Sequence, residues 1–173
     1  MDTGQDAVAD LRLGDLDIVL TEYDAASSPP TEPGLALYHL AFDPYLLVIP
    51  PDWQVIPGSL RDLAGRPWVA GPPGTACDHA LLRLAAEAGI SIPAGDVCVE
   101  FPSVLTLVTA GRGAAIIPRT ALMQAQVTVC DLPPLGGRHI GAWHQAGPSQ
   151  PPPATETVLG ALARAAHGLP QAA

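Results

Sequence analysis

Lysine is absent from this sequence of 173 residues, and only 14% of its residues are charged. All side-chain positive charge at neutral pH therefore comes from eight arginines, which face 17 acidic residues and leave a net charge of −9. Proteins that bind nucleic-acid phosphates or anionic membranes need a clustered basic surface. The arginines are scattered, and several have acidic neighbours, as in Arg61-Asp62. Direct binding of this chain to nucleic acid or to a membrane is therefore not expected.

Cysteine is almost as scarce. Cys77, Cys98 and Cys130 are odd in number and far apart, which argues against a disulfide framework or a zinc site and predicts plain core thiols. Segment 1–6 is acidic without an apolar core, so no signal peptide is predicted. No run approaches the roughly 18 apolar residues that span a bilayer. We therefore expect a cytoplasmic chain without metal or cofactor.

Strand and helix patterns alternate along the chain, and 48% of its residues are hydrophobic, enough for a packed core. This alternation predicts an α/β protein with mostly parallel sheets. The aliphatic run 16–20 predicts a strand buried on both faces. Strands are also expected over residues 35–40, 45–49, 68–70, 97–99, 114–117, 127–129 and 140–143, with a break near Asp43-Pro44. Helices are expected over 6–13, over 59–63, from Thr75 to Gly89, from a Ser103 cap to Gly111, and from Thr155, with an exposed loop over 25–34 and a Pro-rich spacer over 148–153.

Three segments of the chain, residues 11–20, 60–69 and 108–118, together resemble the effector domain of LysR-type bacterial transcription regulators. Residues 11–20 are similar to the family's unit of a helix, a glycine and a Leu-Asp-hydrophobic strand. Residues 60–69, LRDLAGRPWV, resemble its Leu-x-Asp-Leu-Ala-Gly-x-Pro-Trp-Ile segment. Residues 108–118, VTAGRGAAIIP, resemble its Val-x-Ala-Gly-x-Gly-Ile-Ala-hydrophobic-Leu-Pro segment. Their order and spacing match across nearly the whole chain.

The resemblance implies a type-2 periplasmic-binding-protein-like fold, with two α/β lobes and two hinge crossings. By analogy, the first lobe comprises residues 1–43 and 131–173, and the second lobe residues 44–130. A small-molecule effector, a carboxylate or an aromatic metabolite, would lie between them. The family's winged helix-turn-helix and linker helix have no counterpart in this sequence. The effector domain's own first strand, first helix and second strand are missing too, so we expect an incomplete first lobe. Its open sheet edge favours a homo-oligomer or association through that edge.

The start of the helix after Thr75 is one candidate ligand site. Free N–H groups in the first turn of a helix bind carboxylates well, so Gly74, Thr75 and Ala76 are candidate ligand contacts. Thr75 as a simple helix cap is the alternative, and Asp78 in the same turn would oppose a bound anion.

By resemblance, two further segments face the cleft between the lobes. Thr21, Glu22 and Tyr23 follow the strand over 16–20: Glu22 would accept a hydrogen bond from an amine or hydroxyl, and Tyr23 would stack on a ring. An ordinary solvated loop is the alternative. Phe101 and Ser103 precede a helix on the second lobe, where Ser103 as a plain cap is equally compatible with the sequence.

No pattern in the sequence indicates catalysis, since no serine has a nucleophile-elbow context and no histidine lies at a pairing distance from a nucleophile. A solute-binding module unlinked to transcription, or a degenerate remnant of the same fold, remains open. A redox sensor using Cys77, whose place at a helix start would lower its pKa, and an enzyme of the same fold are the less favoured alternatives.

Overall fold

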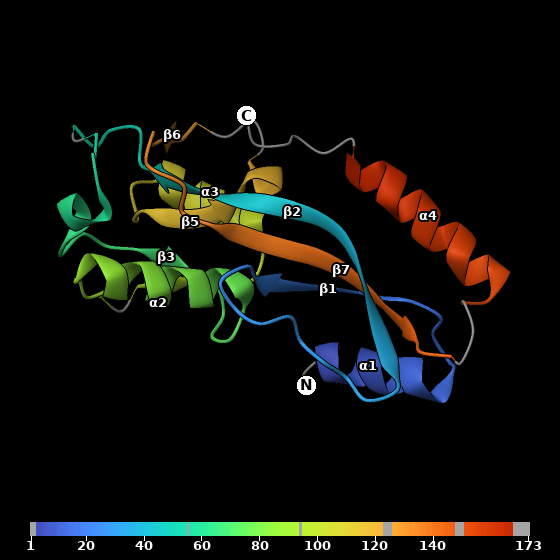
Figure 1. Cartoon of the computed structure of the whole chain (residues 1–173). Helices are drawn as coiled ribbons and strands as arrows, with labels where there is room; N and C mark the ends of the chain where they lie inside the picture. Colours follow the sequence, from blue (N-terminus) through green and yellow to red (C-terminus); the bar gives the residue numbers. More distant parts are fainter. Residues whose placement is uncertain (1–2, 55, 94, 123–125, 148–150, 168–173) are drawn as a thin grey trace.

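The computed structural model describes residues 3–54, 56–93, 95–122, 126–147 and 151–167. Figure 1 shows helices and strands alternating along an elongated molecule. The helices are α1 (Thr3–Leu13), α2 (Ala76–Ala88), α3 (Phe101–Thr109) and α4 (Pro153–His167), with 3-10 turns η1 (Leu60–Leu63) and η2 (Arg119–Ala121). The strands are β1 (Val19–Asp24), β2 (Leu35–Ile49), β3 (Val69–Ala70), β4 (Asp96–Val97), β5 (Ala115–Pro118), β6 (Thr128–Val129) and β7 (Gly137–Gln145).

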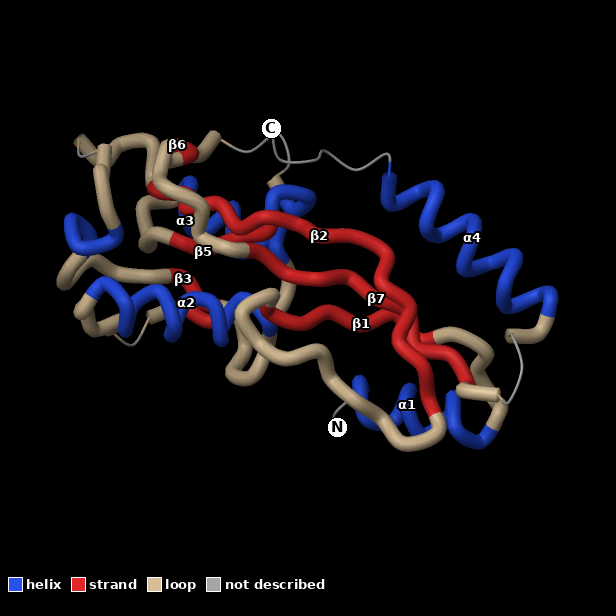
Figure 2. The backbone as a smooth tube through the Cα atoms, viewed as in Figure 1, coloured by secondary structure: helices blue, strands red, loops and turns tan. Residues whose placement is uncertain are grey.

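Strand β2 runs through the whole molecule, and the chain crosses back between β6 and β7 (Figure 2). The first lobe contains α1, β1, the first part of β2, β7 and α4. The second lobe contains the last part of β2 and the elements from η1 to β6. Figure 2 shows α1 and α4 beside the strands at one end and α2 and α3 at the other. The prediction of two α/β lobes joined by two crossings is confirmed.

The prediction of mostly parallel sheets is wrong. The main sheet has the order β1-β7-β2-β5, with β6 also on β2, and every pair in it is antiparallel. Within the described residues, parallel pairing is limited to β3 with β4 and to the bridge between Trp68 and Ala114. The reason is the crossing itself: the chain enters the second lobe along β2 and returns to the first along β7, so these neighbouring strands run in opposite directions.

The predicted break near Asp43-Pro44 is also absent. β2 continues through Asp43 and Pro44, which pair with Arg138 and Gly137 of β7. Ladder pairing resumes beyond the proline, because the Tyr45 N–H donates to the Gly136 carbonyl at 3.0 Å. The irregularity lies earlier, as a register shift between His39 and Ala41. The lobe boundaries at 43/44 and 130/131 stay a prediction.

The second lobe has a core on both faces of its sheet. Leu47 and Ile49 of β2 belong to the cluster that includes α2, whereas Val48 packs with Val104 and Val108 of α3. Successive strand residues point to opposite faces, so a continuous aliphatic run is required when helices cover both sides. All four residues of β5 are buried for the same reason.

The first lobe has a smaller core, in which Leu159 of α4 packs with Leu40 and Ala142. The predicted strand over 16–20 lies further along, as β1, and its expected burial on both faces is wrong. β1 pairs only with β7 among the described residues, and Leu20 is 58% exposed. A strand at the edge of a sheet lacks the second neighbour that would bury it.

The ends of α2 and η1 follow the sequence, whereas the start of α3 does not. Thr75 caps α2, Gly89 closes it at φ 67°, and Ser59 and Asp62 form the capping box of η1. α3, however, is capped by Glu100 and has Pro102 in its first turn, so Ser103 lies inside the helix and is not its cap. Proline in the first turn loses no helical hydrogen bond, which favours this earlier start.

Other elements differ in length from the prediction. β7 is more than twice as long as the expected 140–143, and β4 ends before Cys98. α4 begins at Pro153, two residues before Thr155. Of the spacer predicted over 148–153, residues 148–150 lie outside the described residues.

Candidate functional site

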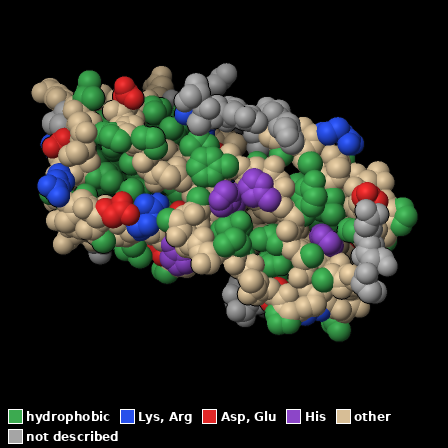
Figure 3. Space-filling model, in the orientation of Figure 1, with side chains coloured by type: hydrophobic (Ala, Val, Ile, Leu, Met, Phe, Trp, Pro, Cys, Tyr) green, Lys and Arg blue, Asp and Glu red, His purple; other side chains and the backbone are tan. Residues whose placement is uncertain are grey.

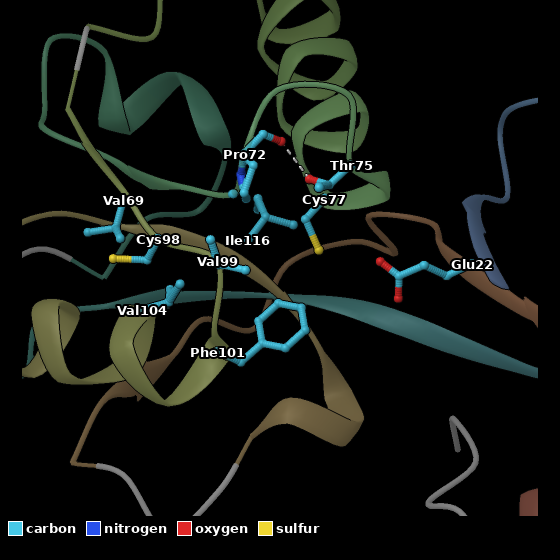
Figure 4. A pocket seen from close by; sticks show the side chains of 11 residues that line it. Glu22, Val69, Pro72, Thr75, Cys77, Cys98, Val99, Phe101, Val104 and Ile116 are labelled. Atoms are coloured by element: carbon cyan, nitrogen blue, oxygen red, sulfur yellow. Dashed lines mark hydrogen bonds between the residues drawn. The ribbon is translucent and has the colours of Figure 1, made fainter. Parts of the chain in front are cut away.

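A cavity of about 80 Å³ opens between the two lobes (Figure 4). Its second-lobe walls come from the loop between β3 and α2, from the segment leading into α3, and from β5. Glu22 of β1 closes it from the first lobe, and Figure 4 shows its carboxylate directed toward Cys77. The lining residues are Glu22, Val69, Gly71, Pro72, Thr75, Cys77, Cys98, Val99, Phe101, Val104 and Ile116.

Three of the predicted ligand contacts, Glu22, Thr75 and Phe101, line this cavity. Each comes from a different segment, so the fold brings together residues that lie up to 79 positions apart in sequence. Whether any of them contacts a ligand stays a prediction. Pro72 and Val99 also line the cavity; Pro72 belongs to the tight loop before α2, and no signal in the sequence distinguishes Val99.

The other five predicted contacts do not line the cavity. Thr21 and Tyr23 alternate with Glu22 along β1 and therefore lie on the opposite face of the sheet. There the Tyr23 ring lies 5.2 Å from the His139 ring. The remaining three are an exposed glycine, a buried alanine and an exposed serine: Gly74, Ala76 and Ser103.

Several polar groups at the start of α2 have partners within the protein. The Thr75 hydroxyl donates to the Pro72 carbonyl at 2.9 Å and accepts from the Asp78 N–H at 3.3 Å. The Gly74 N–H donates to the Asp78 carboxylate at 2.8 Å. A negative side chain in the first turn also complements the positive end of the helix dipole. The Asp78 carboxylate at this helix start would therefore oppose a bound anion.

Behind the cavity, Arg138 of β7 connects the two lobes. Its Nε and Nη2 donate to Oδ2 of Asp43 at 3.2 and 3.1 Å, and Nη1 contacts the Glu22 carboxylate. Nη2 also lies 3.4 Å from the Thr120 hydroxyl of the second lobe. The guanidinium carbon lies 5.4 Å from the centre of the Phe101 ring, within cation–π range. Sequence reasoning missed Arg138 and Asp43, because nothing local marks residues that meet across 95 positions.

The burial of Cys77 argues against the redox alternative. Burial, together with the nearby Glu22 carboxylate, raises the pKa of this thiol to about 12. The expected lowering by the helix start is outweighed because burial penalises the thiolate. A thiol of this kind is inert at neutral pH. Cys130 is buried as well, and its pKa is raised to about 11 by desolvation.

Positive charge on the described surface is dispersed, and half of the eight arginines are paired with acidic residues. Arg12, Arg83, Arg112 and Arg138 each form a salt bridge with an acidic residue. On the face shown in Figure 3, red and blue side chains are interspersed and form no continuous basic patch. Over the described ranges, no group of three or more His, Cys, Asp or Glu side chains is arranged to hold a metal ion. No helix in the same ranges is long and apolar enough to cross a membrane.

Two lobes, two crossings and a cavity between the lobes define a binding module of the α/β class. The family model described as LysR substrate binding domain matches residues 1–166, and the chain belongs to this family. Its effector domains have the type-2 periplasmic-binding-protein-like fold, as the sequence predicts. No curated protein sequence matches the chain.

Solved structures of this fold are similar over nearly all of the chain. The effector-binding domain of QuiR in complex with shikimate has a TM-score of 0.74 at 18% identity, over 95% of this chain and 78% of that domain. The regulatory domain of CcmR from Synechocystis PCC6803 in complex with 2-PG has a TM-score of 0.70 at 16% identity, over 97% and 82%. Full-length CbnR complexed with target DNA has a TM-score of 0.72 at 18% identity, over 96% and 58%.

Proposed function

We propose that this effector-binding module takes its small molecule into the cavity between Glu22 of the first lobe and Thr75 and Phe101 of the second. The observation that carries the proposal is that residues from both lobes line one cavity. A ligand that contacts both sides binds the closed arrangement better than the open one, and only such a difference in affinity shifts the lobes. The solved complexes of QuiR and CcmR contain small molecules, which supports this class of ligand.

The lining favours a compact ligand with an apolar or aromatic body. Val99, Val104 and Ile116 offer aliphatic walls, and Phe101 offers a ring for stacking. The volume of about 80 Å³ lies below the range of about 300–1,000 Å³ for drug-sized ligands. A molecule larger than a single ring would therefore require the lobes to open. Whether the ligand is an acidic metabolite, the other expectation from the sequence, depends on the charges around the cavity.

The module works without catalysis in this proposal. Burial suppresses the nucleophilicity of Cys77. The Thr75 hydroxyl both donates a hydrogen bond to a backbone carbonyl and accepts one from a backbone N–H. In an intact regulator the closure would pass to DNA-binding domains through a homo-oligomer in the cytoplasm, the compartment in which regulators that bind DNA operate. A solute-binding module unlinked to transcription would bind the same ligand without that output.

Ligand-induced thermal stabilisation tests the proposal. A panel of single-ring and short aliphatic acids, amines and alcohols is screened against the whole chain. A compound present at 100 times its Kd stabilises the fold by about 2.7 kcal/mol. Phe101→Ala should weaken binding of the compound about tenfold through lost ring contact, and Thr75→Val should weaken it less.

Thr157→Val is the matched control, since the Thr157 hydroxyl donates to a carbonyl of its own helix start, Pro153, at 2.7 Å but lies far from the cavity in α4. Its effect on affinity should be negligible. A compound whose binding is unchanged in both Phe101→Ala and Thr75→Val does not occupy this cavity, and that result would refute the proposal.

A further inference from the structure

Glu22 is the one charged residue among the described residues that line the cavity. Its side chain is 40% exposed and faces the apolar wall of the second lobe (Figure 4). Its Oε2 atom accepts from Nη1 of Arg138. A carboxylate accepts several hydrogen bonds, so Glu22 can serve Arg138 and a ligand at the same time.

Both features that could attract an anion have a carboxylate of the protein beside them. At the start of α2, the Asp78 carboxylate accepts a hydrogen bond from the Gly74 N–H. The Arg138 guanidinium lies between Asp43 and Glu22, so the three side chains together carry one net negative charge. The neighbouring pair of Arg83 and Asp24 is neutral. A third carboxylate here would meet like charge at close range, which is unfavourable in a partly buried site.

The environment of Cys77 indicates the same sign of potential inside the cavity. Besides burial, the carboxylates of Glu22, Asp43 and Asp24 all raise the pKa of the Cys77 thiol, and only Arg138 lowers it. The thiol therefore experiences a field in which negative charge outweighs positive charge. A ligand headgroup beside Cys77 would experience that field too.

We propose that the effector is a small apolar molecule that carries a hydrogen-bond donor, an ammonium or hydroxyl group, bound by Glu22, and that it carries no carboxylate. This inference rests on the proposed function, since it assigns the ligand class of the same cavity. The ring or alkyl body lies against Phe101 and the aliphatic wall, and the donor reaches across to the first lobe. Because Glu22 also accepts from Arg138, the ligand couples the cavity to the crossing at Asp43.

Matched single-ring probes test the charge preference on the whole chain: benzylamine, benzyl alcohol and benzoate. Affinities are measured by calorimetry or NMR titration at low salt, where a partly exposed carboxylate is least screened. Benzylamine should bind most tightly, benzyl alcohol less tightly and benzoate least. Glu22→Gln should weaken benzylamine about tenfold or more, because a hydrogen bond to a charged group is lost. The same change should not weaken benzoate.

Glu156→Gln is the control. Glu156 is an exposed acid in the first turn of α4, so its replacement removes the same charge at a position away from the cavity. Phe101→Ala distinguishes failure of the proposed ligand class from failure of the proposed function. If benzoate binds more tightly than benzylamine, and Phe101→Ala abolishes that binding, the cavity binds effectors but the ligand class is wrong. The inference is equally overturned if Glu22→Gln leaves benzylamine binding unchanged in a variant that unfolds like the parent. If no probe shows binding that depends on Phe101, the proposed function itself fails.

Discussion

Replacing Asp43 with alanine should destabilise the chain more than any other loss of a single carboxylate. Asp43 is 1% exposed and accepts from four donors: Nε and Nη2 of Arg138, and the backbone N–H and hydroxyl of Thr120. These contacts join β2, β7 and η2 at the point where the chain passes between the lobes. Alanine would leave a guanidinium whose side chain is 11% exposed with Glu22 as its remaining acidic partner.

The expected loss follows from the burial of this pair. Removing one partner of a buried ion pair typically costs about 3–5 kcal/mol. Glu22 stays available to Arg138, so we expect the lower end, about 3 kcal/mol. For a chain of this length such a loss lowers Tm by roughly 6–12 °C. Asp43→Asn keeps the shape and one acceptor oxygen, and should cost about 1–2 kcal/mol.

Urea unfolding, followed by circular dichroism and tryptophan fluorescence, measures the loss. Asp17→Ala is the control: Asp17 is exposed in the loop before β1, and its replacement should stay within about 0.5 kcal/mol. If Asp43→Ala costs less than about 1 kcal/mol, or no more than Asp17→Ala, the carboxylate does not hold the crossing and the reasoning is refuted.

Three further predictions concern the packing and the thiols. Gly113→Ala should cost at least about 2 kcal/mol in urea unfolding, because its Cβ would lie 2.6–2.8 Å from backbone atoms of Pro67 and Trp68, whereas Gly160→Ala in α4 should gain up to about 1 kcal/mol; equal effects would contradict this account. Iodoacetamide at pH 8 should modify Cys98 first, since Cys77 and Cys130 are buried; fastest modification of Cys77, read by mass spectrometry, would contradict it. The pKa values of the Cys77 and Cys130 thiols are raised from 9.0 to about 12 and about 11. Their contribution to stability is therefore full below pH 9 and is lost as the pH rises through the raised pKa values. A urea midpoint that stays flat between pH 8 and 11 would count against this pH dependence.

Local signals in the sequence predicted most elements and the caps of α2 and η1. Thr75 and Gly89 bound α2 because a hydroxyl before a helix and a glycine in the left-handed conformation after it satisfy backbone groups within a few residues. Residues 115–117 are buried as expected, since an uninterrupted aliphatic run suits only a strand covered on both faces. Three of the eight candidate ligand contacts line the cavity. Each of the three adjoins an element whose position the family resemblance implied.

Five candidates do not line the cavity. For Thr21, Tyr23 and Ser103 the reason is that the face of a strand or helix depends on where that element starts. β1 begins at Val19 and continues to Asp24, so Thr21 and Tyr23 face away from Glu22. The sequence placed this strand three residues earlier and treated all three residues as a loop. Starting α3 two residues before Ser103 similarly turned an expected cap into an exposed helical residue.

The family resemblance of three sequence segments implied the family and the two-lobed α/β architecture. Local hydrogen bonds and the periodicity of apolar residues indicated most elements and the caps of α2 and η1. Only the tertiary structure decided that β2 and β7 run antiparallel, that Arg138 meets Asp43 and Glu22, and that the cavity carries negative charge. Strand pairing and electrostatic potential arise from residues distant in sequence, and no local pattern encodes which of them become neighbours.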